Sequence, residues 1–300
     1  MSSRSDRVLG VGRARERALL AVPALALALL GAARVQRPAV AAAGGAAPAG
    51  VLRVCADPNN LPFSDSTGRG FDNRVAALLA AELHDSVRYT WWAQRRGFVR
   101  NTLKARRCDV VAGVPAGDEQ MLTTAPYYRS TYVFVTRRGT PPVRSFDDPR
   151  LRRLRVGIHI IGASYNSVPP GVALARRGIT RNVVGYSIYG DYAKPSPPSA
   201  LITGVARGDV DVAVAWGPLA GYYARRSPVP LVLTPVAADP SSPAARFVYP
   251  MALGVRRGDT ALRVALERAV ERRRADLQQI LRTYGVPLCA PETPGGAACD

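Results

Sequence analysis

The side chains that most often perform acid–base or nucleophilic chemistry are scarce in this chain. It has two histidines, His84 and His159, and His159 lies near the end of the apolar run RVGIHII. No combination of serine, histidine and acid has a supporting motif, and no Gly-rich phosphate loop is present. The sequence therefore predicts a protein that is not an enzyme, without catalytic residues, metal or cofactor. His159 is expected to be a buried structural side chain or part of a binding cleft.

The four cysteines are Cys55, Cys108, Cys289 and Cys299, and they allow three disulfide connectivities. No spacing is C-x-x-C, so the sequence supports neither a redox motif nor a structural zinc site. We favour Cys55–Cys108, which joins two predicted neighbouring strands, together with Cys289–Cys299, which closes a short loop in a Pro/Gly-rich tail.

Two adjacent tryptophans, Trp91 and Trp92, stand in the stretch YTWWAQRRGFVRN. Side chains alternate between the faces of a strand, so one tryptophan is expected to pack beneath a helix. The other, for which Trp92 is our candidate, is expected at the rim of a cleft. Arg95 and Arg96 precede a helix predicted to begin near Gly97, where the helix dipole prefers anions. The arginine pair is therefore either simply solvated or a site for an acidic group of a partner.

The elements that must position these residues form two α/β units. In the first unit, strands and helices alternate, and this order predicts a parallel sheet with right-handed crossovers. Its elements are expected at 51–55, 71–83, 87–92, 98–106 and 109–114. A strand at 132–136 leads to the second unit, whose elements are expected at 155–161, 172–178, 182–187, 199–207, 210–215 and 218–225. A strand at 249–255 returns to the first unit, and one long amphipathic helix follows at 260–284.

This order predicts an α/β fold of two lobes, with two crossover strands, a central cleft and closure about a hinge. The predicted boundaries are a signal peptide at 1–43, a disordered linker at 44–50, the first part of lobe 1 at 51–138, lobe 2 at 139–236, the return segment of lobe 1 at 237–287 and a tail at 288–300.

The loops at strand ends supply the candidates for the cleft. The first lobe contributes Asp57, Asn59, Asn60, Phe63, Pro115, Tyr127, Tyr128 and Arg129. The second lobe contributes His159, Tyr189, Asp191 and Trp216. Trp92, Arg95 and Arg96 complete the set. Asp57 has an alternative role, because its side chain can close an Asx turn with Asn59.

The N-terminal segment has the pattern of a secretory signal peptide, with a basic start, an apolar run at 18–33 and small residues at 39–43. The apolar run is shorter than the roughly 20 residues of a membrane-spanning helix. Export to the periplasm is therefore expected, with no membrane span after cleavage. An uncleaved anchor is the alternative.

The chain is strongly basic, with a formal net charge of +19. Residues 1–43 hold seven arginines against Asp6 and Glu16, so the remaining chain carries about +14. This charge either reflects a GC-rich genome or provides a surface that attracts an acidic partner or an anionic membrane. Export argues against nucleic acid as the partner.

Seven motifs, in order along the chain, resemble one branch of the type 2 periplasmic binding proteins. They are VCADPNNLPFSD, YTWWAQRRGFVRNTL, RCDVVAGVPAG, LTTAPYYRSTYVFVTRR, GYSIYGDY, VAVAWGPLAGYYARR and GVRRGD. The branch comprises the periplasmic proteins that accompany PQQ-dependent methanol dehydrogenases, the MxaJ/XoxJ type. The resemblance covers about 51–287 and implies the two-lobed fold and a periplasmic location.

The resemblance also implies a partner. It implies that the chain binds a PQQ-dependent methanol dehydrogenase, apo or holo, and assists its maturation or activity, with a c-type cytochrome as a further neighbour. Amino-acid receptors of the superfamily hold the ligand carboxylate with an arginine before the PYY-like motif, but GVPAGDEQMLTTAPYY contains none. The alternative is a solute-binding receptor of an ABC importer for a small periplasmic solute. A third candidate is an enzyme on the same fold.

Overall fold

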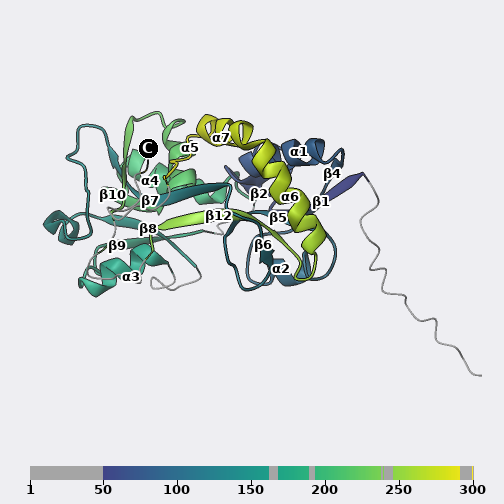
Figure 1. Cartoon of the computed structure of the whole chain (residues 1–300). Coiled ribbons are helices and arrows are strands. Elements are labelled where there is room, and N and C mark those ends of the chain that lie inside the picture. The colour runs from purple at the N-terminus through teal and green to yellow at the C-terminus, as the bar shows by residue number, and fades with distance from the viewer. Residues whose placement is uncertain are drawn as a thin grey trace, which may run out of the picture. The chain divides into compact units, whose positions relative to one another are not determined.

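Ten of the described strands form one sheet in two halves, which meet at two long strands (Figure 1), and two short strands form a separate sheet. The computed structural model describes residues 50–161, 168–188, 193–237, 239, 246–290 and 299. The order of the strands in the large sheet is β4 (Ser86–Trp91), β1 (Val51–Ala56), β5 (Val110–Pro115), β12 (Val248–Val255), β7 (Tyr128–Arg137), β10 (Val212–Trp216), β8 (Val156–Ile160) and β9 (Val183–Ser187). Strand β11 (Leu231–Pro235) pairs with β7, and β6 (Leu122–Thr123) pairs with β12. The predicted two-lobed α/β fold is confirmed. The predicted signal peptide lies outside the described residues.

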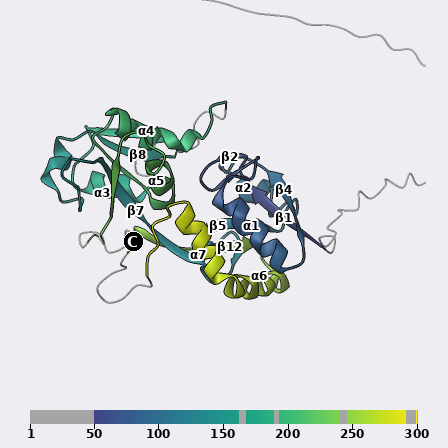
Figure 2. The ribbon, with the colours of Figure 1, turned by 90° about the horizontal axis from the view of Figure 1, so that it is seen from above.

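The first half is built on β1 (Val51–Ala56), which lies between β4 (Ser86–Trp91) and β5 (Val110–Pro115). Both pairs are parallel, as the β-α-β-α-β order predicts. Helix α1 (Phe71–Glu82) places apolar side chains at helical spacing against this sheet, where they are buried. It lies beside the two C-terminal helices, α6 (Thr260–Arg272) and α7 (Arg274–Thr283) (Figures 1 and 2).

The second half is built on β10, which pairs with β8 in parallel and with β7 in antiparallel orientation. Its strands are β8 (Val156–Ile160), β9 (Val183–Ser187), β10 (Val212–Trp216) and β11 (Leu231–Pro235). Its helices are α3 (Pro169–Arg176), α4 (Ala200–Arg207) and α5 (Gly217–Ala224), which lie around these strands in Figure 2. Two apolar clusters fill this half, one around Ile158 and Val214 and the other around Val135 and Ala213.

One strand, β7 (Tyr128–Arg137), belongs to both halves. Its residues 128–131 pair with β12 (Val248–Val255), and its residues 132–136 pair with β10. These are the two predicted crossover strands. The lobe boundaries at 138 and 236 stay predictions, because β7 contributes hydrogen bonds to each side.

Two predicted helices differ from those of the structure. Helix α2 spans only Phe98–Asn101, not 98–106, because Thr102 leaves the helical region (φ −118°, ψ −80°) and its hydroxyl donates to Phe98 O at 2.7 Å. The long helix at 260–284 is divided into α6 and α7, because Arg273 between them has φ −103° and ψ 19°.

Several short elements were not predicted, and most are too short to show a hydrophobic period. They are the strands β2 (Asn59–Asn60), β3 (Ser64–Asp65) and β6 (Leu122–Thr123) and the 3-10 helices η1 (Pro149–Arg152) and η3 (Pro197–Ser199). Strand β11 was also missed, since prolines flank its apolar run PLVLTP on both sides.

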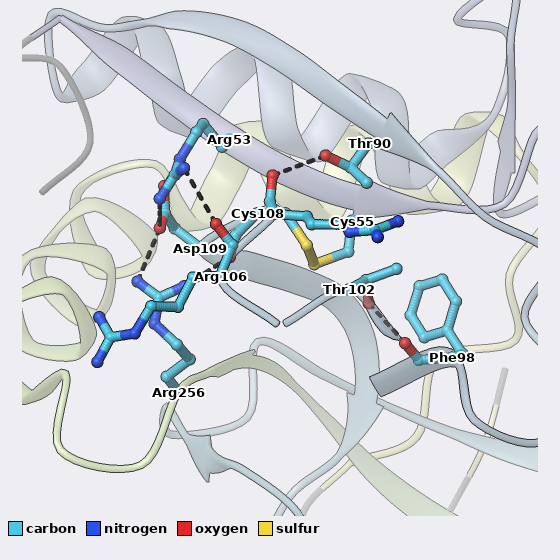
Figure 3. The surroundings of a disulfide bond; sticks show 10 residues. Arg53, Cys55, Thr90, Phe98, Thr102, Arg106, Cys108, Asp109 and Arg256 are labelled. Atoms are coloured by element: carbon cyan, nitrogen blue, oxygen red, sulfur yellow. Dashed lines mark hydrogen bonds and ion pairs between the residues drawn. A yellow bond between two sulfur atoms is a disulfide. The ribbon is translucent and has the colours of Figure 1, made fainter. Parts of the chain in front are cut away.

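The structure contains both disulfides that we favoured, Cys55–Cys108 and Cys289–Cys299. Cys55 and Cys108 are almost fully buried, with Cα atoms 5.4 Å apart (Figure 3). Their different strand positions are no obstacle, because the chain before β5 runs beside Thr90, whose hydroxyl donates to Arg107 O at 2.8 Å. Thr90 is the strand neighbour of Cys55.

An ion-pair network lies beside this disulfide (Figure 3). Asp109 accepts two hydrogen bonds from Arg53, at 2.6 and 2.7 Å, and one from Arg256 at 2.8 Å. Burial alone would raise the pKa of Asp109, but the hydrogen bonds from the two guanidinium groups outweigh it and hold the pKa below its usual range. The network therefore ties β1, β5 and the segment after β12 together.

Candidate functional site

A cavity of about 490 Å³, here called the cleft, is lined by residues of both halves. Seven of the predicted site residues line it: Asp57, Asn59, Asn60, Phe63, Pro115, His159 and Trp216. Sequence reasoning missed further lining residues, among them Asp72, Gln94, Tyr132, Tyr249 and Met251. A second cavity of about 610 Å³ lies at β11 and the 285–288 segment, and none of the predicted cleft residues lines it.

Asp57 shapes the loop at the edge of the cleft. Its carboxylate accepts the backbone N–H of Asn59 at 2.8 Å, which closes the Asx turn considered as an alternative. The other oxygen accepts the N–H of Gln94 at 2.6 Å. Gly70 closes the same loop and needs to be glycine, because a Cβ there would lie 2.0 Å from Phe63 O. Asp57 therefore fixes the position of two lining segments.

Hydrogen bonds join the two halves across the cleft edge. The amide of Asn59 donates to Lys194 O at 2.9 Å and accepts from Ser196 N at 3.0 Å. On helix α5, Tyr223 donates its hydroxyl hydrogen to Leu61 O at 3.0 Å. The structure thus has the halves held together by direct polar contacts.

His159 is a buried side chain that also lines the cleft. Its Nε2 lies 3.1 Å from Pro198 O, so the neutral ring donates its hydrogen there. Burial lowers the pKa of His159 to about 4, because a charged imidazolium would lose its hydration. The side chain is therefore neutral at physiological pH and adds no positive charge to the cleft.

Three aromatic side chains, Tyr132, Trp216 and Tyr249, form what we call the aromatic wall of the cleft. The Tyr132 and Trp216 ring centroids are 5.4 Å apart, and Tyr249 lies 5.8 Å from Trp216 and 6.3 Å from Tyr132. All three pairs are edge-to-face, with interplanar angles of 62–79°. The wall joins both halves, because its residues come from β7, β10 and β12.

Asp72, in the first turn of α1, is an acid that lines the cleft, and no basic side chain of the described residues acts on it. Its Oδ1 is buried and has no hydrogen-bond partner among the described residues. Burial raises the pKa of Asp72 to about 8. The Tyr127 hydroxyl lies beside this carboxyl and lowers its pKa by less than burial raises it. The buried Tyr128 hydroxyl has no hydrogen-bond partner in the described part of the chain.

Several predicted site residues lie away from the cleft. Tyr127 and Tyr128 are 4% and 6% exposed and belong to the core of the first half. Arg129 does not line the cleft, and its carbonyl accepts from Cys289 N at 3.0 Å. Tyr189 and Asp191 lie outside the described residues.

Trp91 and Trp92 lie in different environments, as the alternation of side chains along a strand predicts. Trp91 stacks on Tyr89, with ring centroids 4.5 Å apart, against the core of the first half. Trp92 is 38% exposed, and the guanidinium of Arg107 lies 5.6 Å from its ring centroid. Arg95 and Arg96 are exposed and directly follow Gln94, which lines the cleft. Trp92, Arg95 and Arg96 themselves are not among the described residues that line it.

Known proteins are similar to this one in architecture and in sequence. Residues 52–287 match the bacterial extracellular solute-binding proteins, family 3. The chain belongs to this family. As a member of family 3, it is 33% identical to the protein MoxJ of Methylorubrum extorquens over 290 residues, which cover 91% of this chain and 96% of the relative.

A second curated relative and a crystal structure support the same family relationship. This family 3 protein is 30% identical to MoxJ of Paracoccus denitrificans over 248 residues, 79% of this chain and 88% of the relative. The crystal structure of the periplasmic binding protein XoxJ from Methylobacterium extorquens AM1 superposes with a TM-score of 0.66 at 34% identity, covering 80% of this chain and 100% of that chain. The resemblance to the MxaJ/XoxJ type is thus confirmed.

The described residues contain neither a helix that could cross a membrane nor a cluster of side chains that could hold a metal ion. Across the described ranges, helices are too short or too polar to cross a membrane. In the same ranges, histidine, cysteine and acidic side chains do not gather in groups of three that could hold a metal ion.

Proposed function

We propose that this protein is a periplasmic accessory protein that binds a PQQ-dependent methanol dehydrogenase and assists its maturation or activity. The similarity to MoxJ and XoxJ, together with the seven motifs of the MxaJ/XoxJ type, supports the choice of partner. The observation that carries the binding role is an exposed basic surface beside the cleft.

This basic surface consists of Trp92 and the six cations that follow it in the sequence up to residue 107. The cations are Arg95, Arg96, Arg100, Lys104, Arg106 and Arg107, and no acid interrupts them. All six are exposed. An exposed tryptophan within a field of one charge sign is typical of a surface that docks an acidic protein.

The backbone beneath the basic surface is held in place. The disulfide Cys55–Cys108 ties its C-terminal end to β1, and Thr90 binds Arg107 O. A pre-ordered surface loses less conformational entropy when a partner binds. The basic surface is therefore suited to recognise a folded or partly folded dehydrogenase without rearranging.

Capture of the cognate apo-dehydrogenase by the immobilised protein tests this proposal. We expect association that weakens as salt is raised, because exposed charges are screened over about 10 Å at 0.1 M salt. In the double variant Arg95→Ala/Arg96→Ala we expect association to be about tenfold slower, with little change in the unfolding midpoint.

The control is the double variant Arg152→Ala/Arg153→Ala, which removes two adjacent exposed arginines at the C-terminal end of η1 in the second half. Both variants lose the same net charge, so a loss confined to Arg95 and Arg96 identifies the basic surface. Equal capture by both variants and the wild type would contradict the docking surface, and no capture at all would contradict the proposed function.

The cleft favours a second candidate function, a solute-binding receptor of an ABC importer. A cavity of about 490 Å³ with lining residues from both halves has room for a small solute. Ligand binding to the native state raises the unfolding temperature. A shift with a periplasmic metabolite, without capture of the dehydrogenase, would favour this candidate.

A further inference from the structure

The ionisable side chains of the cleft are acidic, although the chain as a whole is basic. The sequence contains 41 lysines and arginines, yet none of the described residues that line the cleft is one of them. The acidic groups on the lining are Asp57 and Asp72, and His159 is neutral. A ligand with a carboxylate would lose its hydration here and meet two acids without a cation.

Asp57 and Asp72 differ in what their carboxyl groups already bind. Both oxygens of Asp57 accept backbone hydrogens, so its charge is compensated locally. Asp72 Oδ1 is buried without a partner in the described ranges. A buried acid in this situation gains most from a positive group that arrives with a ligand.

A glycine in strand β5 makes room for the Asp72 carboxyl. Gly113 on β5 has φ +66°, and a Cβ there would lie 3.1 Å from Asp72 Oδ2. Only glycine adopts this conformation without strain and also leaves the space. The Asp72 carboxyl therefore occupies the space next to Gly113, and both residues line the cleft.

The aromatic wall offers the complementary surface. Ring faces of tryptophan and tyrosine attract cations through their quadrupoles, most strongly when water is excluded. Tyr132, Trp216 and Tyr249 are each partly exposed and meet at steep angles, so they form a corner of the cleft. Such a corner contacts a rounded methylated ammonium group from more than one side.

We propose that the cleft binds a small organic cation without a carboxylate, a methylated ammonium, which sits on the aromatic wall with Asp72 as its counter-ion. This inference goes beyond the proposed function and does not depend on it, because the basic surface lies outside the cleft. The raised pKa of Asp72 agrees with it, since a bound cation would supply the charge that an ionised Asp72 lacks.

Titration calorimetry with three probes tests the ligand class on the protein purified from the periplasm. Choline carries the cation, 3,3-dimethylbutan-1-ol replaces its nitrogen by carbon, and glycine betaine adds a carboxylate to the same trimethylammonium group. We expect choline to bind at least about tenfold more tightly than either of the other two. Binding of the neutral alcohol or of betaine as tightly as choline, or no binding of choline, would overturn the proposal.

Variants locate the site. We expect Trp216→Leu, which keeps an apolar side chain but removes the ring, and Asp72→Asn each to weaken choline binding at least about fivefold. Asp209→Asn is the control, because it removes an exposed acid of the second half that does not line the cleft. Thermal unfolding of each variant verifies that it is folded. Unchanged choline affinity in folded Trp216→Leu and Asp72→Asn would contradict the site.

Discussion

Asp72 is a buried acid that lowers the stability of the fold when it is ionised, and it is also the proposed counter-ion for a ligand in the cleft. It faces the hydroxyl-bearing side chains Tyr89, Tyr127 and Tyr128, and no cation lies against it among the described residues. Its folded pKa of about 8 lies above the unfolded value, so folding takes up a proton at neutral pH. This contribution favours folding at low pH and is lost as the pH rises from about 4 through 8.

We expect Asp72→Asn to be more stable than the wild type at pH 8, by at least about 1 kcal/mol, because the amide cannot ionise in the unfolded state. The difference should vanish towards pH 4, where the wild-type carboxyl is neutral in the folded state and half protonated in the unfolded state. Urea unfolding of both proteins at several pH values measures it. A difference that does not change with pH would contradict the raised pKa.

At the residue scale, sequence reasoning found groups whose neighbours are close in the chain. The Asx turn from Asp57 to Asn59 and the opposite settings of Trp91 and Trp92 follow from local rules. Asp72 was missed because an acid in the first turn of a helix is ordinary. Only the tertiary fold, through Gly113 and the tyrosines, makes it unusual.

At the scale of elements, the disulfide Cys55–Cys108 links β1 to the entrance of β5 across a sequence separation of 53. We expect Cys55→Ala/Cys108→Ala to lower the free energy of unfolding by about 4 kcal/mol, because the cross-link removes chain entropy from the unfolded state in proportion to the logarithm of the loop length. Urea denaturation of the purified variant measures it.

The matched control is Cys289→Ala/Cys299→Ala, whose disulfide spans a separation of 10. The same relation gives about 3 kcal/mol for this shorter loop. A larger loss in the control than in Cys55→Ala/Cys108→Ala would show that loop length does not govern these two bonds.

The alternation of strands and helices was predictable because each has its own hydrophobic period. The ends of helices were less predictable. The segment 98–106 has a helical composition, but Thr102 and Arg106, which has φ +57°, turn the chain towards Cys108. The segment 260–284 keeps its apolar period through Arg273, so nothing in the pattern marks the break between α6 and α7.

At the scale of the whole described fold, three hydrogen bonds join the halves at the cleft edge: Asn59 donates one and accepts one, and Tyr223 donates the third. Each is worth about 1 kcal/mol, so together they bias the protein towards contact between the halves. We expect Asn59→Ala/Tyr223→Phe to increase the radius of gyration in small-angle X-ray scattering, because hinge opening becomes easier.

The control is Asn182→Ala/Tyr89→Phe, which removes the same side-chain types from bonds inside one half each. This variant should keep the wild-type radius of gyration. An unchanged radius in the Asn59 and Tyr223 variant would mean that other contacts hold the halves.

The shared strand β7 has a mechanical consequence. Its pairing partner changes from β12 to β10 between Thr131 and Tyr132, so bending of one half against the other changes the twist of this strand at that step, together with the second crossover that leads to β12. Tyr132, the residue at the step, carries one ring of the aromatic wall. A ligand bound against that ring would therefore contact β7 at the step where its pairing partner changes. Ligand binding in the cleft would then be coupled directly to the angle between the two halves.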